Sequence, residues 1–147
     1  MPTIIAATDG SPSARAAVDR AVAEAIASDA KLELVGAWSI PVNGELGAPG
    51  LMSEDVFYAD RNAMAAILAE AKSAASEAGI DAETCLVSGD AAAEICRLAD
   101  EQDASLIVMG TRGHKPLAAA ILGSVATRVL QHAACPVMVV PDSEPRS

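Results

Sequence analysis

Short apolar runs alternate with helical apolar stripes along the whole chain. Five short apolar runs predict strands: the first and fourth are expected to be buried, and the last is expected to lie at a sheet edge. They are Thr3 to Thr8, Leu32 to Trp38, Glu83 to Val87, Leu106 to Met109 and Pro136 to Val140. Strict alternation of such strands with amphipathic helices predicts an α/β fold with right-handed crossovers. The sheet is then parallel, and helices cover both of its faces.

Four segments between the strands predict helices. The first begins after Ser11, a good N-cap before Pro12, and carries one apolar stripe. That stripe consists of Ala14, Ala17, Val18, Ala21, Val22 and Ala25. A long alanine-rich helix lies within Ser53 to Ala78, starting either at Ser53 or nearer Asp60, and Gly79 stops it.

Two shorter helices follow. Ala91 to Glu101 should turn Ile95, Leu98 and Ala99 inward. Ser124 to His132 has three apolar positions, which are Val125, Val129 and Leu130.

Two segments are expected to be irregular. Ile40 to Met52 is rich in glycine and proline, which predicts a loop that either covers the mouth of a site or is a surface insertion. The polar tail after Pro141 is expected to fray.

The stretch from Ala104 to Val125 carries the chemistry. A buried strand ends in Gly110, Gly113 follows in the loop, and Gly123 precedes Ser124 at the start of a helix. A loop that opens a helix aims unpartnered N–H groups and the positive end of the helix dipole at an anion, such as phosphate. Glycines would let the backbone approach that ligand, although each alone can simply make a turn. Ser124 can cap the helix, bind a phosphate oxygen, or do both.

Charged residues stand at the ends of two predicted strands. Asp9 follows the first strand and is suited to accept hydrogen bonds from ribose hydroxyls; the alternative is an Asx-turn. Arg112, His114 and Lys115 lie in the glycine loop, where Arg112 can neutralise a phosphate in bidentate fashion. For His114 and Lys115, a solvated loop face is the favoured alternative.

These residues carry a family resemblance. Gly110, two residues, Gly113, nine residues and then Gly123-Ser124 resembles the nucleotide-binding signature of the ATP-binding universal stress proteins. Thr8-Asp9-Gly10-Ser11, Leu122 to Ala126 and Ala134 to Val140 agree with it. The resemblance implies one domain over residues 1–147, a Rossmann-like fold of the adenine nucleotide alpha hydrolase type, and strand order 3-2-1-4-5.

The resemblance also implies a binding site and a dimer. Backbone amides around the second and third glycines would cradle phosphates, while Ala7, Ala37 and Met109 would line the adenosine pocket; ATP-binding members often have proline where Ala7 stands. The expected nucleotide-binding residues are Ala7, Thr8, Asp9, Ala37, Met109, Gly110, Arg112, Gly113, Gly123, Ser124, Val125 and Ala126. Pro136 to Val140 would pair antiparallel with its twin in a homodimer.

Composition narrows the class of protein. The net charge of −10, with scattered basic residues, argues against a nucleic-acid or anionic-membrane partner. With 52% hydrophobic but 2% aromatic residues, the core must be built from small aliphatic side chains. Cys85, Cys96 and Cys135 have no C-x-x-C spacing and are interpreted as small buried hydrophobes in a reducing compartment. No signal peptide or spanning segment is visible, so a cytoplasmic protein is expected.

The predicted function is adenine-nucleotide binding in stress response, by a sensor or regulator rather than an enzyme. ATP or AMP is the expected ligand; Mg²⁺ could accompany it, though no carboxylate cluster is dedicated to the ion. No P-loop, G-x-G-x-x-G after the first strand, or G-x-S-x-G elbow is present. One alternative is a slow ATPase or nucleotidyl transferase that uses Arg112 or Lys115. Another is a cyclic-AMP-binding protein or an interaction protein that binds no nucleotide.

Overall fold

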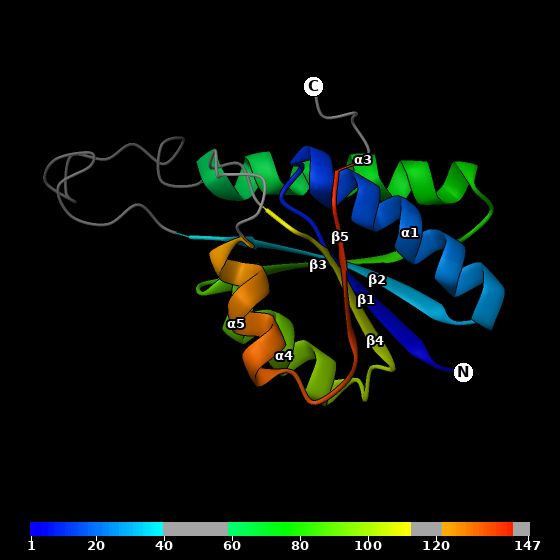
Figure 1. Cartoon of the computed structure of the whole chain (residues 1–147). Helices are drawn as coiled ribbons and strands as arrows, with labels where there is room; N and C mark the ends of the chain where they lie inside the picture. The colour runs from blue at the N-terminus through cyan, green and yellow to red at the C-terminus, as the bar shows by residue number, and fades with distance from the viewer. Residues whose placement is uncertain (40–58, 113–121, 143–147) are drawn as a thin grey trace, which may run out of the picture.

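The computed structural model describes residues 1–39, 59–112 and 122–142, in which strands and helices alternate as predicted (Figure 1). In chain order the elements are β1 (Thr3–Ala7), α1 (Pro12–Ser28), β2 (Lys31–Trp38), α3 (Ala59–Glu77), β3 (Glu83–Ser88), α4 (Ala91–Glu101), β4 (Leu106–Gly110), α5 (Ser124–His132) and β5 (Val137–Val140). The observed strand bounds differ from the predicted ones by at most one residue at either end. The sequence pattern therefore located the described elements correctly.

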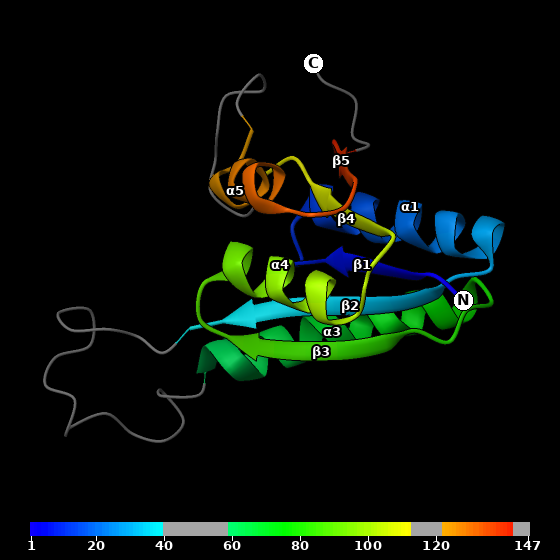
Figure 2. The same ribbon diagram turned by 90° about the horizontal axis from the view of Figure 1, so that it is seen from below.

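The five strands form one parallel sheet in the order β3-β2-β1-β4-β5, which confirms the predicted fold class and order (Figure 2). Helices α1 and α3 cover one face, and α4 and α5 cover the other (Figure 1). Because β1 pairs with β2 on one side and β4 on the other, the chain reverses its direction of progress across the sheet between β1 and β4. Ligands of open α/β sheets bind at such a switch point.

Side chains of the central strands alternate between two hydrophobic cores. Ile4 and Ala6 of β1 face α1 and α3, whereas Ile5 faces α4 and α5. The predicted stripe of α1 is buried along its whole length, and its alanines let the helix lie close to the sheet. Ile95, Leu98 and Ala99 of α4 are also buried as predicted, but Leu130 of α5 is 47% exposed and is not a core residue.

The observed helix caps agree with those predicted from the sequence, with one exception. Ser11 caps α1, since its Oγ accepts a hydrogen bond from the Ala14 N–H at 3.3 Å. Gly79, at φ +99°, follows the end of α3 as predicted, in a conformation that favours glycine. The expected N-cap role of Ser124 is wrong: Gly123 is the N-cap of α5 and Ser124 is its first helical residue. The sequence could not separate the two because glycine also serves at this position.

Some expectations fall on residues outside the described ranges. These are the character of the loop Ile40 to Met52, the choice of start for α3 before Ala59, and the fraying of residues 143–147. Within the described ranges, no helix is both long and apolar enough to cross a membrane.

Candidate functional site

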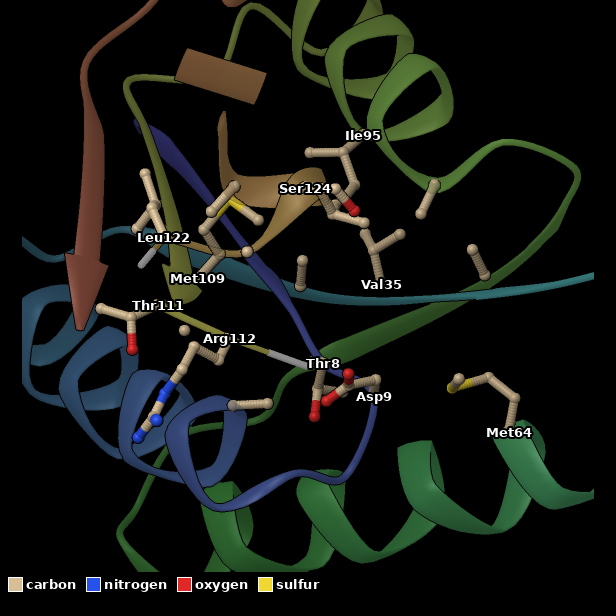
Figure 3. Close-up of a pocket in the computed structure, with 18 residues that line it drawn as sticks. Thr8, Asp9, Val35, Met64, Ile95, Met109, Thr111, Arg112, Leu122 and Ser124 are labelled. Atoms are coloured by element: carbon tan, nitrogen blue, oxygen red, sulfur yellow. The ribbon is translucent and has the colours of Figure 1, made fainter. Parts of the chain in front are cut away.

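A cavity of about 640 Å³ opens at the carboxyl ends of β1, β2 and β4, at the switch point of the sheet (Figure 3). Its size lies in the range of small-molecule sites. The residues that line it are Ala7, Thr8, Asp9, Ala14, Val35, Ala37, Met64, Ala91, Ile95, Met109, Gly110, Thr111, Arg112, Leu122, Gly123, Ser124, Val125 and Ala126. Every expected nucleotide-binding residue within the described ranges is in this set. Gly113 lies outside those ranges.

Asp9 is held by the backbone that follows it. The Ser11 N–H donates to Asp9 Oδ1 at 2.9 Å, which is the Asx-turn that the sequence left as an alternative. Thr8 continues the β1 ladder by donating its N–H to the Val35 carbonyl at 2.9 Å. Because the Asx-turn fixes the Asp9 carboxyl at the edge of the cavity, a structural role and a ligand-binding role are compatible.

The first turn of α1 is joined to the loop after β4. Ser13 Oγ donates to the Arg112 carbonyl at 2.6 Å, and Ser11 Oγ donates to the same oxygen at 3.3 Å. The Arg112 N–H in turn donates to Ser13 Oγ at 3.3 Å. These bonds bring two segments that are about a hundred residues apart to one side of the cavity.

This junction gives Gly110 a structural reason to be glycine, while its expected role in the approach of a ligand stays a prediction. A Cβ atom at Gly110 would lie 2.7 Å from the Ser13 carbonyl carbon and 2.8 Å from the Ala14 nitrogen. Those are backbone atoms of a helix, which cannot rotate away. The spacing of the glycines indicated where glycine is needed, but which neighbour demands it became visible only in the fold.

Arg112 lines the cavity, and its side chain is engaged by a carboxylate. It extends away from Ser124 and Asp9 (Figure 3), and Arg112 Nη2 lies 2.9 Å from Asp142 Oδ2. Both side chains are 21% exposed. The expected contact of Arg112 with a phosphate is therefore not preformed, and it stays a prediction.

The start of α5 faces the cavity with its backbone. The Gly123 N–H donates to the Thr111 carbonyl at 2.6 Å, which fastens the helix start to the end of β4. Within the described part of the chain, no side chain caps this helix end. The first amides of α5 and the positive end of its dipole are thus suited to an anion.

Several apolar residues that line the cavity were not predicted from the sequence. Val35 lies two residues before Ala37, so both point to the same side of β2. Ala91 and Ile95 are four apart on α4 and share one face of it. These spacings were readable signals. No sequence signal pointed to Met64. This side chain reaches the cavity from α3 because Gly36 has no side chain, and a Cβ at Gly36 would lie 2.6 Å from Met64 Sδ.

The three cysteines are free thiols that pack against the core under α4 and α5, and their expected burial is only partial. Burial raises the pKa of each thiol above its ordinary value of 9.0, and at Cys85 the neighbouring Glu33 carboxylate raises the pKa further. Since thiolate is the reactive form, these cysteines should react slowly with alkylating agents. No group of three or more His, Cys, Asp and Glu residues that could hold a metal ion occurs among the residues described.

We expect the thiols to give a defined pH dependence of stability. Their pKa values are raised in the folded state, so above pH 9.0 the unfolded chain loses protons that the folded chain keeps. The free energy of unfolding should therefore be insensitive to these groups below pH 9.0 and fall as the pH rises above it. Urea denaturation of the wild type and of a variant with all three cysteines changed to alanine measures this. An equally steep fall in both proteins would contradict it.

The fold and the cavity together define a single α/β domain with a ligand-sized site at the switch point of its sheet. A profile of the Universal stress protein family matches residues 1–141. The chain belongs to the universal stress protein family, a family of stress-response proteins.

Individual relatives agree over nearly the full length. The chain is 36% identical to universal stress protein YxiE of Bacillus subtilis, over 93% of this chain and 97% of the relative. It is 34% identical to universal stress protein Rv1636 of Mycobacterium tuberculosis, over 94% of both chains.

Two similar solved structures contain an adenine nucleotide. One is a universal stress protein in complex with cAMP, with 36% identity, a TM-score of 0.73 and coverage of 97% of this chain and 98% of that one. The other is the universal stress protein from Archaeoglobus fulgidus in complex with dAMP, with 26% identity, a TM-score of 0.68 and coverage of 95% and 97%.

Proposed function

We propose that the chain binds an adenine nucleotide, AMP or ATP, in the cavity between β1, β2, β4 and α5, and acts in the cytoplasm as a sensor or regulator. The observation that carries this proposal is that the sides of the cavity differ in chemical character. Apolar side chains dominate the side formed by β2 and α4, Asp9 stands at the end of β1, and the uncapped amides of α5 close the third side. The cAMP and dAMP complexes of two similar proteins support it.

Each wall suits one part of a nucleotide. Val35, Ala37 and Ile95 offer the flat apolar surface that a purine base needs. The Asp9 carboxylate would accept hydrogen bonds from ribose hydroxyls. The N–H groups of Ser124, Val125 and Ala126 would take the phosphate, and Gly113 would add its amide from beyond the described residues.

A divalent cation, if present, would come with the nucleotide. Asp9 is the one carboxylate among the described residues that line the cavity, and Mg²⁺ prefers a full shell of oxygen ligands. The protein's own oxygen ligands therefore do not fit a resident Mg²⁺ site. Phosphate oxygens and water would have to supply most of the ligands of the ion.

Binding without catalysis is favoured over the ATPase and nucleotidyl transferase alternatives. Those reactions need a cation at the transferred phosphoryl group, and the Arg112 guanidinium is engaged by Asp142. A turnover assay with ATP and Mg²⁺ separates the classes. Hydrolysis that is lost in Arg112→Ala while ATP binding persists would establish the enzyme instead.

The proposal is tested directly by what the protein carries and binds. We expect denaturation of the purified protein to release an adenine nucleotide that mass spectrometry identifies, and calorimetry of the emptied protein to register binding of AMP, ATP or cAMP. No released nucleotide and no binding of any of the three would leave an interaction protein as the function. Binding of cAMP in preference to AMP and ATP would favour the cyclic-nucleotide alternative.

We further propose a homodimer through the edge strand β5. Its four residues Val137–Val140 are all half-buried apolar residues, and β5 pairs with β4 on one side of the sheet. An apolar edge strand of this kind invites pairing with another copy, and two-fold symmetry would make the pairing antiparallel.

Val139→Asp should shift the protein toward monomer, because a carboxylate would then be buried in the paired edge. Light scattering measures the mass. Thr84→Asp, on the opposite edge strand β3, is the matched control and should leave the mass unchanged. An unchanged mass in Val139→Asp would contradict the interface.

A further inference from the structure

The starts of two helices, α4 and α5, both border the cavity, and they differ in their capping. Ala91 and Ile95 come from α4, and Ser124 to Ala126 come from α5. Asp90 is the N-cap of α4, and its Oδ2 accepts a hydrogen bond from the Ala93 N–H at 2.9 Å. The start of α5 is capped by no side chain in the described ranges. Of these two helix starts, α5 therefore presents the more accessible amides.

A bidentate ion pair joins these two helix starts. Arg128 Nη1 donates to Asp90 Oδ1 at 2.6 Å, and Arg128 Nη2 donates to Asp90 Oδ2 at 2.7 Å. Arg128 lies about one helical turn after Ser124, so it tethers α5 close to the amides that face the cavity. The other ion pairs of the described helices, which are Arg20 with Glu24 and Arg97 with Glu94 and Glu101, stay within one helix.

The pair links α5 to the start of α4 through two hydrogen bonds. Asp90 is fixed by its cap hydrogen bond to α4, and the planar guanidinium meets both carboxylate oxygens at once. The hydrogen bonds from Arg128 lower the pKa of Asp90 below its ordinary value of 3.8, so the carboxylate is ionised at neutral pH. Both partners of the pair are therefore charged at neutral pH.

We infer that Asp90 and Arg128 are positioning residues of the proposed nucleotide site, which hold the first amides of α5 in the direction that a phosphate requires. This inference rests on the proposed function. Amide donors bind an anion best when their direction is fixed before the ligand arrives. The pair touches no ligand itself; it acts through the helix.

The pair contributes little to stability, which makes its role measurable. Both side chains are about half exposed, at 48% and 47%. Exposed ion pairs contribute modestly to folding. A loss of binding that exceeds the loss of stability would thus report on the orientation of α5.

The test compares Arg128→Gln with Arg97→Gln. Arg97 is 49% exposed, pairs with two carboxylates on α4 alone, and loses the same charge in the variant. We expect Arg128→Gln to weaken AMP binding by up to about five-fold, the upper end of the range for an ion pair of this exposure. Adenosine, which has no phosphate, should bind both variants and the wild type equally well. Calorimetry gives the affinities, and thermal melting should show similar small shifts for both variants.

Asp90→Asn provides an independent second variant. Asparagine also caps helices, so α4 should keep its start while the ionic tether is lost. We expect the same selective loss of AMP affinity as in Arg128→Gln.

The outcomes separate the inference from the proposed function. If the wild type binds AMP and Arg128→Gln binds it as tightly as Arg97→Gln does, the positioning role is overturned while nucleotide binding stands. An equal loss of adenosine and AMP affinity would also overturn it, because the wall as a whole would then have moved. If the wild type binds neither ligand, the proposed function fails and the inference fails with it.

Discussion

Gly110→Ala is expected to lower the free energy of unfolding by about 1–3 kcal/mol, the range for forcing extra atoms into a packed core. The added methyl group would meet the Ser13 side chain and the backbone of Ser13 and Ala14 at the start of α1. Relief would require α1 to move away from β4, and that movement would stretch the hydrogen bonds of Ser13 to Arg112. Urea denaturation followed by Trp38 fluorescence measures the change, because the chain has one tryptophan.

Gly36→Ala is the matched control for this prediction. Gly36 also lies in a strand, and a Cβ there would come within 2.6 Å of a neighbouring atom. That atom is Met64 Sδ, in a flexible side chain that can rotate, so we expect a smaller loss of stability than in Gly110→Ala. If the two variants lose the same stability, the backbone of α1 is not what requires glycine at position 110.

Asp9→Asn is expected to weaken AMP binding by roughly 10- to 100-fold, the range for losing a hydrogen bond to a charged group. Asparagine keeps an Oδ1 atom for the Ser11 N–H, so the Asx-turn and the melting temperature should be preserved. Asp9→Ala would lose both the turn and the binding. The asparagine variant therefore separates the two roles of this residue.

The ligand offers its own control for Asp9. dAMP lacks the ribose 2′-hydroxyl, so the loss in Asp9→Asn should be smaller for dAMP than for AMP if the carboxylate holds that hydroxyl. Calorimetry with both nucleotides on both proteins forms a double-mutant cycle. Equal losses for AMP and dAMP would contradict a contact with the 2′-hydroxyl, and unchanged AMP affinity would remove Asp9 from the site altogether.

Most of the fold could be predicted because buried strands and amphipathic helices differ in period. The apolar runs and the α1 stripe located the described elements, and the family resemblance supplied the strand order, which periodicity alone does not determine. The apolar positions of the nine-residue helix Ser124–His132 did not define its buried face, because it has few turns: Val129 is buried and Leu130 is exposed.

The candidate site was predictable where its residues lie next to glycines and strand ends in the sequence. Asp9, Gly110 and Gly123 could be found in this way. The Asp90–Arg128 pair and the Met64 wall could not, because each depends on how two helices far apart in the chain pack against the sheet. The partner of Arg112 is likewise a matter of tertiary structure, since Asp142 follows it by 30 residues.

The junction between α1 and the loop after β4 has a consequence for biosynthesis. Ser13 is made early, but its hydrogen-bond partner Arg112 follows it by 99 residues. A ribosome-bound chain that ends before β4 therefore holds only one half of the residues that line the cavity. The proposed nucleotide would find its complete site only after translation has passed α5.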